Sequence, residues 1–152
     1  MHICEKVTKD LNVSVDNING SGAAGAMGGG MIAFLGAKLQ SGIDTVLDIL
    51  GFDNIISDAD FIFTGEGRFD TQSLSGKAVG GISKRAKKQN IPVIVICGEY
   101  ENHLKEYYEA GVSAVFSINT KAQSFEESRF KTEENLAATI ENILKTIKLG
   151  KA

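Results

Sequence analysis

A cluster of charged residues follows an apolar segment in the middle of the chain. The stretch TGEGRFD, residues 64–70, places Glu66, Arg68 and Asp70 directly after the apolar run ADFIF. Glu66 and Asp70 could hold Mg²⁺, which prefers carboxylate oxygens together with waters and substrate phosphates. Arg68 could bind a phosphate or a substrate carboxylate through two parallel hydrogen bonds. The same residues could instead form a local ion-pair cluster that only makes the loop rigid.

A glycine–lysine pair lies a few residues later, in SLSGKA, at the expected start of a helix. The stretch does not match a Walker loop, because the first glycine is missing and Ala78 replaces the Ser or Thr that binds magnesium. A cation at a helix N-terminus is unfavourable unless an anion binds close by. Lys77 is therefore either a ligand of an anion or a solvated surface lysine.

The third candidate is the glycine-rich segment GSGAAG, residues 20–25, which matches G-x-G-x-x-G. In a dinucleotide-binding fold this motif follows a strand, and an acidic residue about twenty positions later binds the ribose. Asp44 lies near that offset, but it falls inside a helical pattern, and the strand before Gly20 is weak. The segment could otherwise bind an anion through backbone N–H groups at a helix N-terminus. In a third interpretation the glycines only allow helices to pack closely.

Apolar patterns around these motifs predict alternating strands and helices. Helices are expected over residues 3–11, 42–51, 76–90, 101–110 and 132–147, and a buried helix follows the glycine-rich segment. Ser124 and Glu127 form the pattern of a capping box before the last helix. Strands are expected over residues 59–64, 92–97 and 113–118, with a short one at 12–15.

Unbroken apolar strands that alternate with helices predict an α/β fold, with a parallel sheet covered by helices on both faces in a Rossmann- or flavodoxin-like, three-layer arrangement. In open parallel sheets, ligands bind outside the carboxyl ends of the strands. The segments 64–70, 98–101 and 119–124 each follow a predicted strand. A ligand is therefore expected at this edge of the sheet.

Composition limits the function classes. The 152 residues carry a net charge of −3, which gives no basic surface for nucleic acid or for an anionic membrane. The longest apolar stretches are too short to span a bilayer, and the N-terminus lacks the apolar core of a signal peptide. Cys4 and Cys97 have no metal-type spacing. We therefore expect a reduced, cytoplasmic protein without a His or Cys metal site.

These motifs together resemble one known family. The stretches GSGAAGAMGGGMIAFLGAKLQSGIDTVLDILGF, ADFIFTGEGRFDTQSLSGKAVGGISKRAKK, IPVIVICG and AGVSAVFSI run in the same order as in the type I glycerate kinases. The resemblance covers residues 5–148, and it departs at Ala26, where the family usually has glycine, and near Ser41, where it often has proline. It implies transfer of a phosphoryl group from ATP to D-glycerate with Mg²⁺.

The resemblance also implies roles for the candidate residues. Glu66 and Asp70 would position Mg²⁺ or the glycerate hydroxyls, with Asp70 accepting the hydroxyl proton, and Asp44 is a weaker candidate for the same cleft. Arg68 and Lys77 would stabilise the phosphoryl group or the glycerate carboxylate. The glycine-rich loop would bind an anion through its backbone, at Gly20, Ser21, Gly22, Gly25 and Gly28. Whether the 2- or the 3-hydroxyl is phosphorylated stays open.

The family's length implies how this chain is organised. Full glycerate kinases are more than twice as long and have two α/β domains with the active site in the cleft between them. The chain resembles their C-terminal portion, with residues 1–60 belonging partly to the second domain and residues 61–152 to the parallel-sheet domain. The expected partners are the N-terminal segment or a second copy in a homodimer, besides D-glycerate. The alternative function is a non-catalytic anion- or nucleotide-binding module, or a non-catalytic fragment that self-associates.

Overall fold

The computed structural model describes residues 2–122 and 124–150, with the side chains of all of these except residues 2 and 125. The described chain divides into two compact units, one that ends at Ser41 and one that begins at Gly42. The predicted boundary near residue 60 concerns the two domains of a longer protein, and it stays a prediction.

The first unit contains two helices, α1 (His2–Leu11) and α2 (Ala23–Leu35). The predicted strand at residues 12–15 does not form. A strand needs a partner strand to hydrogen-bond with, and the described residues of this unit include none. The prediction that α2 is buried was also wrong. Only Gly29 of α2 is buried, and Met27 and Phe34 are largely exposed, because a unit of this size has no second layer to cover both helix faces.

The second unit contains the sheet and its helices. Its elements are α3 (Gly42–Ile49), α4 (Phe52–Ile55), β1 (Ile62–Phe69), η1 (Thr71–Leu74), α5 (Ala78–Lys88), β2 (Val93–Tyr100), α6 (Leu104–Glu109), β3 (Ala114–Ser117), α7 (Phe125–Ser128), η2 (Arg129–Lys131) and α8 (Thr132–Gly150). The capping box is confirmed, because Ser124 and Glu127 exchange side-chain-to-backbone hydrogen bonds at 3.2 and 3.3 Å.

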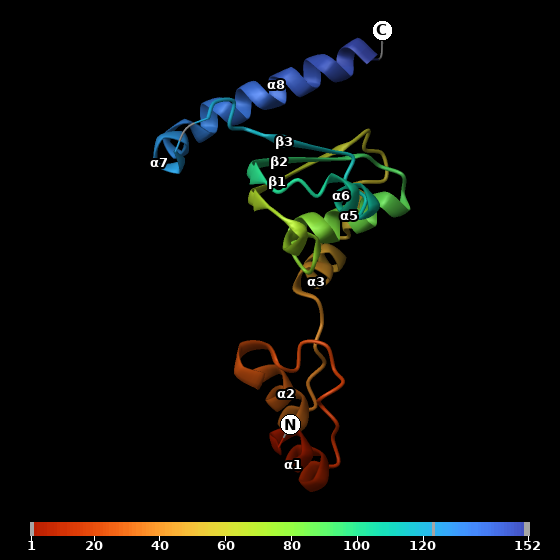
Figure 1. The fold of residues 1–152 in the computed structure, drawn as a ribbon. Coiled ribbons are helices and arrows are strands. Elements are labelled where there is room, and N and C mark those ends of the chain that lie inside the picture. Colours follow the sequence, from red (N-terminus) through yellow and green to blue (C-terminus); the bar gives the residue numbers. More distant parts are fainter. Residues whose placement is uncertain (1, 123, 151–152) are drawn as a thin grey trace. The chain divides into compact units, whose positions relative to one another are not determined.

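The three strands form one parallel sheet in the order β1-β2-β3. Successive residues of β2 point to opposite faces, as the period of two requires. Val93, Val95 and Cys97 join one apolar cluster, with Val79 and Ala86 of α5 and Tyr107 of α6. Ile94 and Ile96 join a second cluster with residues of α8. Helices therefore cover both faces, α5 and α6 on one and α8 on the other, which confirms the predicted α/β fold (Figure 1).

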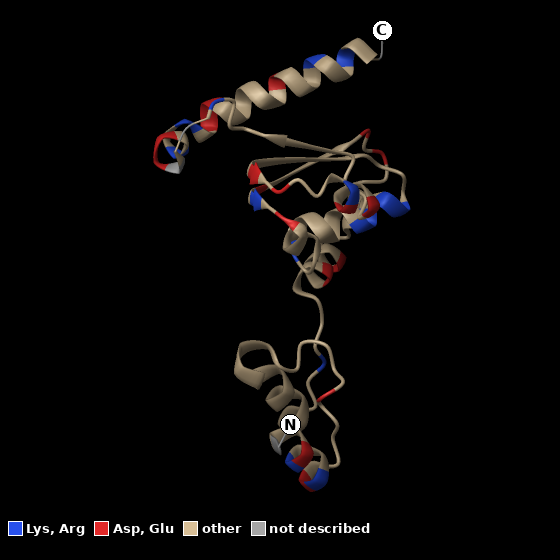
Figure 2. Cartoon of the chain, viewed as in Figure 1, with Lys and Arg blue, Asp and Glu red and all other residues tan. Residues whose placement is uncertain are grey.

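The basic run on α5 is only partly a solvated surface. Lys and Arg positions cluster toward the carboxyl end of α5 (Figure 2), and the side chains of Lys84, Lys87 and Lys88 are exposed. Arg85 instead is only 12% exposed and forms ion pairs with carboxylates of the α3–α4 segment, at 2.5 Å to Asp48 and 3.3 Å to Asp53. These ion pairs tie α5 to the helices that precede the sheet.

Candidate functional site

The charged stretch 64–70 continues the first strand instead of forming a loop after it. β1 runs to Phe69, and its pairing with β2 includes Arg68 opposite Glu99 and Phe69 opposite Tyr100. The two strands are thus longer than the apolar patterns predict. The side chains still lie at the carboxyl ends of the strands, because β2 is extended in step with β1.

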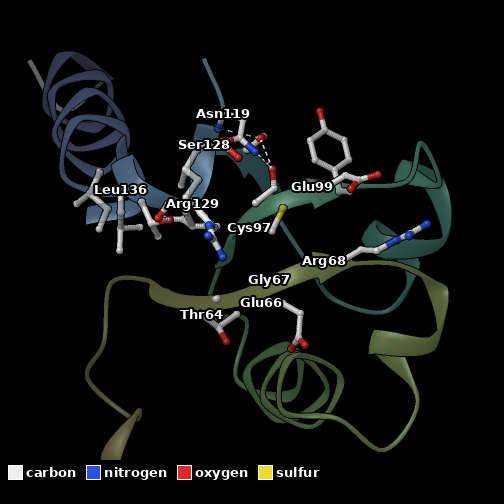
Figure 3. Close-up of a pocket in the computed structure, with 18 of the residues that line it drawn as sticks. Thr64, Glu66, Gly67, Arg68, Cys97, Glu99, Asn119, Ser128, Arg129 and Leu136 are labelled. Carbon is white, nitrogen blue, oxygen red and sulfur yellow. Dashed lines mark hydrogen bonds between the residues drawn. The ribbon is translucent and has the colours of Figure 1, made fainter. Parts of the chain in front are cut away.

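A cavity of about 980 Å³ opens at this edge, between the sheet and the start of α8. Its lining includes the ends of all three strands, and also Arg129 of η2 and Leu136 of α8 (Figure 3). The predicted location of the ligand site therefore contains a real cavity. It lies on the α8 face of the sheet, within the second unit.

Two polar residues at this cavity, Asn119 and Arg129, are not part of the predicted motifs. Asn119, just beyond β3, donates a hydrogen bond from Nδ2 to the Gly98 carbonyl at 2.7 Å, and Ser117 Oγ donates to the same oxygen at 2.9 Å. Arg129 extends from η2 toward the strands, and it forms an ion pair with Glu126 at 3.1 Å (Figure 3). The rule that ligands bind at the carboxyl ends of parallel strands points to the segment that contains Asn119. No sequence pattern points to Arg129.

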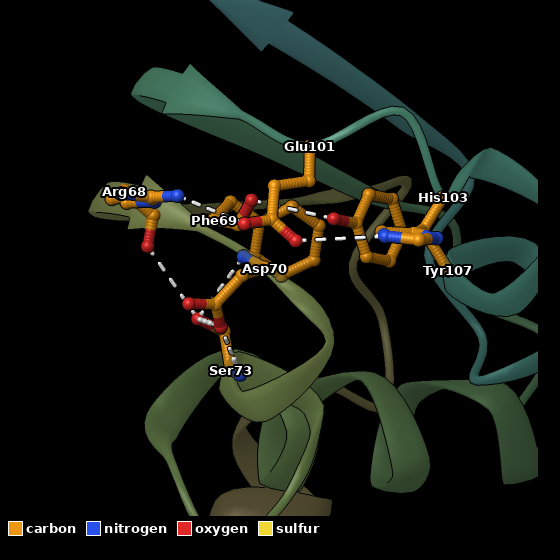
Figure 4. Close-up of polar contacts among 7 residues, drawn as sticks. All are labelled: Arg68, Phe69, Asp70, Ser73, Glu101, His103 and Tyr107. Atoms are coloured by element: carbon orange, nitrogen blue, oxygen red, sulfur yellow. Dashed lines mark hydrogen bonds and ion pairs between the residues drawn. The ribbon is translucent and has the colours of Figure 1, made fainter.

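Arg68 forms its ion pair with a residue from the next loop. Its Nη2 lies 2.9 Å from Glu101 Oε1, and Glu101 Oε2 lies 3.5 Å from His103 Nε2 (Figure 4). The hydrogen bond to Glu101 and the nearby charge of Glu99 raise the pKa of Arg68, so the guanidinium stays charged. The predicted local cluster of Arg68 with its neighbours in the stretch is therefore replaced by a pair between β1 and the loop that follows β2.

The backbone at the end of β1 is fixed by the same loop. The Phe69 carbonyl accepts hydrogen bonds from the Glu101 backbone N–H at 3.1 Å and from the Tyr107 hydroxyl at 3.3 Å. Phe69 and Tyr107 are fully buried, with ring centroids 4.3 Å apart (Figure 4). The chain directly after Arg68 is thus held in place.

Asp70 caps the short helix η1, and Lys77 reaches the same place. Asp70 Oδ1 accepts hydrogen bonds from the backbone N–H and the hydroxyl of Ser73, at 2.9 and 3.0 Å. Lys77 Nζ donates to the Ser73 hydroxyl at 3.4 Å. Lys77 is the N-cap residue of α5, so the predicted helix start is confirmed. The structure therefore brings Asp70 and Lys77 together through one buried serine.

A glycine of α5 allows η1 to pack this closely. A side chain at Gly80 would overlap the Leu74 carbonyl, whose backbone belongs to η1. The fold thus requires glycine at this position, and the contact sets the distance between Asp70 and the start of α5.

Glu66 also lines the cavity, but its side chain points away from Arg129 (Figure 3). By strand alternation it shares the face of Ile62, which packs into the cluster under α5, and of Arg68, two residues further along β1. Glu66 and Arg68 therefore lie on the same face of β1, one on each side of Gly67.

The glycine-rich segment belongs to the first unit and has an unusual backbone. Ala24, Gly25 and Ala26 have φ values of 51°, 68° and 68°, so the first turn of α2 is left-handed. A side chain at Gly28 would lie 2.6 Å from the Gly20 carbonyl. Close packing thus explains glycine at position 28. The dinucleotide interpretation lacks its strand, because no strand precedes Gly20 in the described residues.

Asp44 does not reach the cavity. It lies in the first turn of α3, and its carboxylate is 3.8 Å from Arg85 Nη2. This ion pair gives Asp44 a structural role in the contact between α3 and α5.

Comparison with known proteins identifies the family. The model of the glycerate kinase family matches residues 1–148. The chain belongs to the glycerate kinase family. It is 43% identical over 149 residues to a glycerate kinase of Bacillus cereus and 38% identical to the glycerate 2-kinase of Escherichia coli K12. It is also similar to the solved structure of a protein assigned as glycerate kinase 2 in Salmonella typhimurium LT2, with a TM-score of 0.73 and 37% identity.

The chain spans only part of the length of its relatives in the family. The match to the Bacillus protein covers 98% of this chain and 39% of that protein, and the match to the Salmonella structure covers 99% and 38%. The sequence-based assignment to the glycerate kinases is confirmed, and so is the inference that the chain corresponds to a part of the full enzyme.

The fit of the acidic residues to Mg²⁺ depends on Asp70. Among the described residues, no three His, Cys, Asp or Glu side chains gather into a metal-binding group. Mg²⁺ in phosphoryl-transfer sites is usually held by one or two carboxylates together with substrate phosphates and water. Asp70 fits this pattern as a single carboxylate, and both hydrogen bonds from Ser73 are made to its Oδ1.

The sequence predicts no segment that spans a bilayer. None of the helices in the described part of the chain is long and apolar enough to cross a bilayer.

Proposed function

We propose that this chain supplies part of the active site of an enzyme that phosphorylates D-glycerate with ATP. The observation that carries the proposal is the match of nearly the whole chain to the glycerate kinase family. The charged residues at the carboxyl ends of the strands support it, because phosphoryl transfer depends mainly on positioning and on neutralising charge.

In this proposal, Asp70 and Arg68 carry the main roles. Asp70 accepts the proton of the attacking glycerate hydroxyl or holds Mg²⁺ through Oδ2. Arg68 stabilises the transferring phosphoryl group or the glycerate carboxylate, since its guanidinium is rigidly backed by Glu101. Mg²⁺ would supply neutralisation of the phosphate charge.

The other predicted residues have supporting roles. Lys77, which is linked to Asp70 through Ser73, adds positive charge to the same region. Glu66 is a second carboxylate for the metal or for a glycerate hydroxyl. The backbone of the glycine-rich segment, with Gly20, Ser21, Gly22 and Gly25, would bind an anion. Gly28 contributes through the close packing already described.

The rest of the family fold is the proposed partner. Large apolar side chains on α2 and α3 are exposed, including Met27 at 65%, Phe34 at 72% and Ile49 at 80%. Exposed apolar side chains on this scale are typical of surfaces that pack against other protein. A second copy of the chain in a homodimer is the other predicted partner. The proposed location is the cytoplasm, where ATP is the phosphoryl donor.

A chimeric enzyme tests the proposal. This chain replaces the matching 149-residue part of the Bacillus cereus relative, and ATP-dependent phosphorylation of D-glycerate is measured. The parent kinase is the positive control, and the parent lacking that part is the negative control. We expect turnover with D-glycerate that the negative control lacks. A chimera that folds like its parent and gives no turnover would overturn the proposed function.

A further inference from the structure

We propose that the cavity between the sheet and α8 binds the adenosine end of ATP, with the phosphates directed toward Arg68. This inference rests on the proposed function for the identity of the nucleotide, but its geometry belongs entirely to the second unit.

The size and lining of the cavity fit a nucleoside better than D-glycerate. A volume of about 980 Å³ is at the upper end of small-molecule sites, whereas D-glycerate has only three carbons. Apolar side chains from the sheet and from α8 line the cavity: Phe63, Ile96, Ile118, Leu136 and Ile140. A purine base gains by burying its faces on such a surface, whereas a small hydroxy acid would lose hydration there without compensation.

Gly67 has no structural reason to be glycine. It lies inside a strand, where glycine normally weakens the structure, and it is not among the glycines with positive φ. A Cβ at Gly67 would meet no atom within 4 Å, whereas a Cβ at neighbouring Gly98 would lie 2.8 Å from the Gly67 carbonyl. Packing therefore explains Gly98, but at Gly67 glycine leaves open space at the cavity, as close approach of a ligand requires.

Asn119 gives the cavity a preference between bases. Its amide is oriented by the hydrogen bond to the Gly98 carbonyl, which only the Nδ2 side can donate. Within the described part of the chain, Oδ1 carries no hydrogen bond, so it is an acceptor at the rim. Adenine offers a 6-amino donor to such an acceptor, whereas guanine presents a carbonyl oxygen at the same position. The cavity should therefore prefer adenine nucleotides.

Two arginines define the phosphate end. Arg68 and Arg129 both border the cavity, and their side chains are 60% and 49% exposed, so a ligand can reach both guanidinium groups. Each is already paired with one carboxylate, Glu101 or Glu126, which holds it in place. Arg68 lies near the carboxyl end of β1, on the side of the cavity away from Leu136 of α8 (Figure 3), so the base points under α8 and the phosphates point outward.

Binding to the chain alone is the first test. Isothermal titration with ADP, adenosine, GDP and D-glycerate is expected to show saturable binding of ADP and adenosine, with GDP about tenfold weaker. Absence of saturable ADP binding to the folded chain at several millimolar would overturn the inference. Displacement of ADP from the cavity by D-glycerate at similar concentrations would also overturn it.

Matched tryptophan variants locate the binding. Leu136 and Leu144 lie on the same helix with the same exposure, 37%, but only Leu136 is among the residues that line the cavity. We expect Leu136→Trp to weaken ADP binding at least tenfold and Leu144→Trp to leave it unchanged. Equal effects of the two substitutions, or none, would contradict the proposed location.

Two further variants test the inference independently of α8. Gly67→Val should weaken ADP binding at least tenfold without lowering the melting temperature, because valine favours strands and meets open space. Asn119→Ala should remove the preference for ADP over GDP. Tight ADP binding by folded Gly67→Val would contradict the proposal.

The chimera separates this inference from the proposed function. An active chimera in which Leu136→Trp leaves the KM for ATP unchanged would overturn the inference and keep the kinase function. If the chimera is inactive, but the chain binds ADP and the Leu136, Gly67 and Asn119 variants change binding as expected, the proposed kinase function is overturned and the nucleotide site is kept.

Discussion

Ser73 donates two hydrogen bonds to the same oxygen of Asp70, one from its backbone N–H at 2.9 Å and one from its hydroxyl at 3.0 Å. Burial alone would raise the pKa of Asp70, but these hydrogen bonds and the positive charge of Lys77 lower it below its ordinary value of 3.8. Asp70 is therefore a carboxylate at neutral pH, ready to bind a cation or to accept a hydrogen bond from a hydroxyl.

The first prediction concerns catalysis by Asp70. Asp70→Asn keeps an oxygen that can accept the Ser73 hydrogen bonds, but it removes the charge. In the chimera, kcat for D-glycerate should fall by roughly 10²–10⁴-fold, with the fold retained. The exposed Asp58→Asn is the matched control and should be neutral. A loss of less than about tenfold would remove Asp70 from the role of proton acceptor.

The second prediction concerns acid stability. The pKa of Asp70 is lower in the folded chain than its ordinary value of 3.8. The carboxylate's contribution to the free energy of unfolding is therefore complete above pH 3.8, and it is lost as the pH falls through the pKa of the folded state. The melting temperatures of the native chain and of Asp70→Asn should therefore differ by a constant amount above about pH 5 and become equal as the pH falls below 3.8. A difference that grows on acidification would contradict the lowered pKa.

The third prediction concerns the packing of η1 against α5. Gly80→Ala would drive a methyl group into the Leu74 backbone, which cannot rotate away, so it should destabilise the chain by about 1–3 kcal/mol. Gly42→Ala, at the start of α3, is the control. Its Cβ would meet no atom within 4 Å, so its cost should be under about 1 kcal/mol. Urea unfolding measures both, and equal costs would contradict the assigned contact.

Sequence patterns predicted the elements well where local signals and tertiary contacts agree. The helices α3, α5 and α6 and the parallel strands follow from apolar periodicity and from stops such as Gly51, which adopts a left-handed φ of 62°. The extension of β1 through TGEGRF was not predictable, because glycines and charges disfavour a strand locally. Pairing with β2 across Arg68 and Glu99 overrides that preference.

The site was harder to predict than the fold. Arg68 and Asp70 were chosen as candidates from their types and spacing, but their partners in the structure, Glu101 and Ser73, are set by how the β2–α6 loop and η1 fold back. Arg129 lies some 60 residues from the stretch along the chain, and only the return of η2 over the sheet brings it to the cavity. Conversely, Asp44 matched a spacing rule but is paired with Arg85.

The fourth prediction concerns the left-handed start of α2. Ala26 has φ of 68°, a conformation that costs an alanine about 1–2 kcal/mol and a glycine little. Ala26→Gly should therefore stabilise the first unit by up to about 1 kcal/mol, measured by hydrogen exchange of its amides. Gly25→Ala is the reverse experiment. It has the same φ and nothing within 4 Å of its Cβ, so only backbone strain should destabilise it. Stabilisation by Gly25→Ala would contradict the left-handed turn.

The last prediction concerns Cys97, which is 2% exposed on the α5 face of β2. Burial raises the pKa of its thiol from 9.0 to about 11, so at pH 8 only about 0.1% would be the reactive thiolate. Iodoacetamide should label half-buried Cys4 in the native chain and label Cys97 only after unfolding in urea. Because the folded pKa is raised, the protonated thiol's contribution to stability is complete below pH 9 and is lost as the pH rises toward 11. Cys97→Ala should reduce that loss of stability at alkaline pH. In the labelling experiment, rapid labelling of Cys97 in the native chain, detected by mass spectrometry, would contradict its burial in the core.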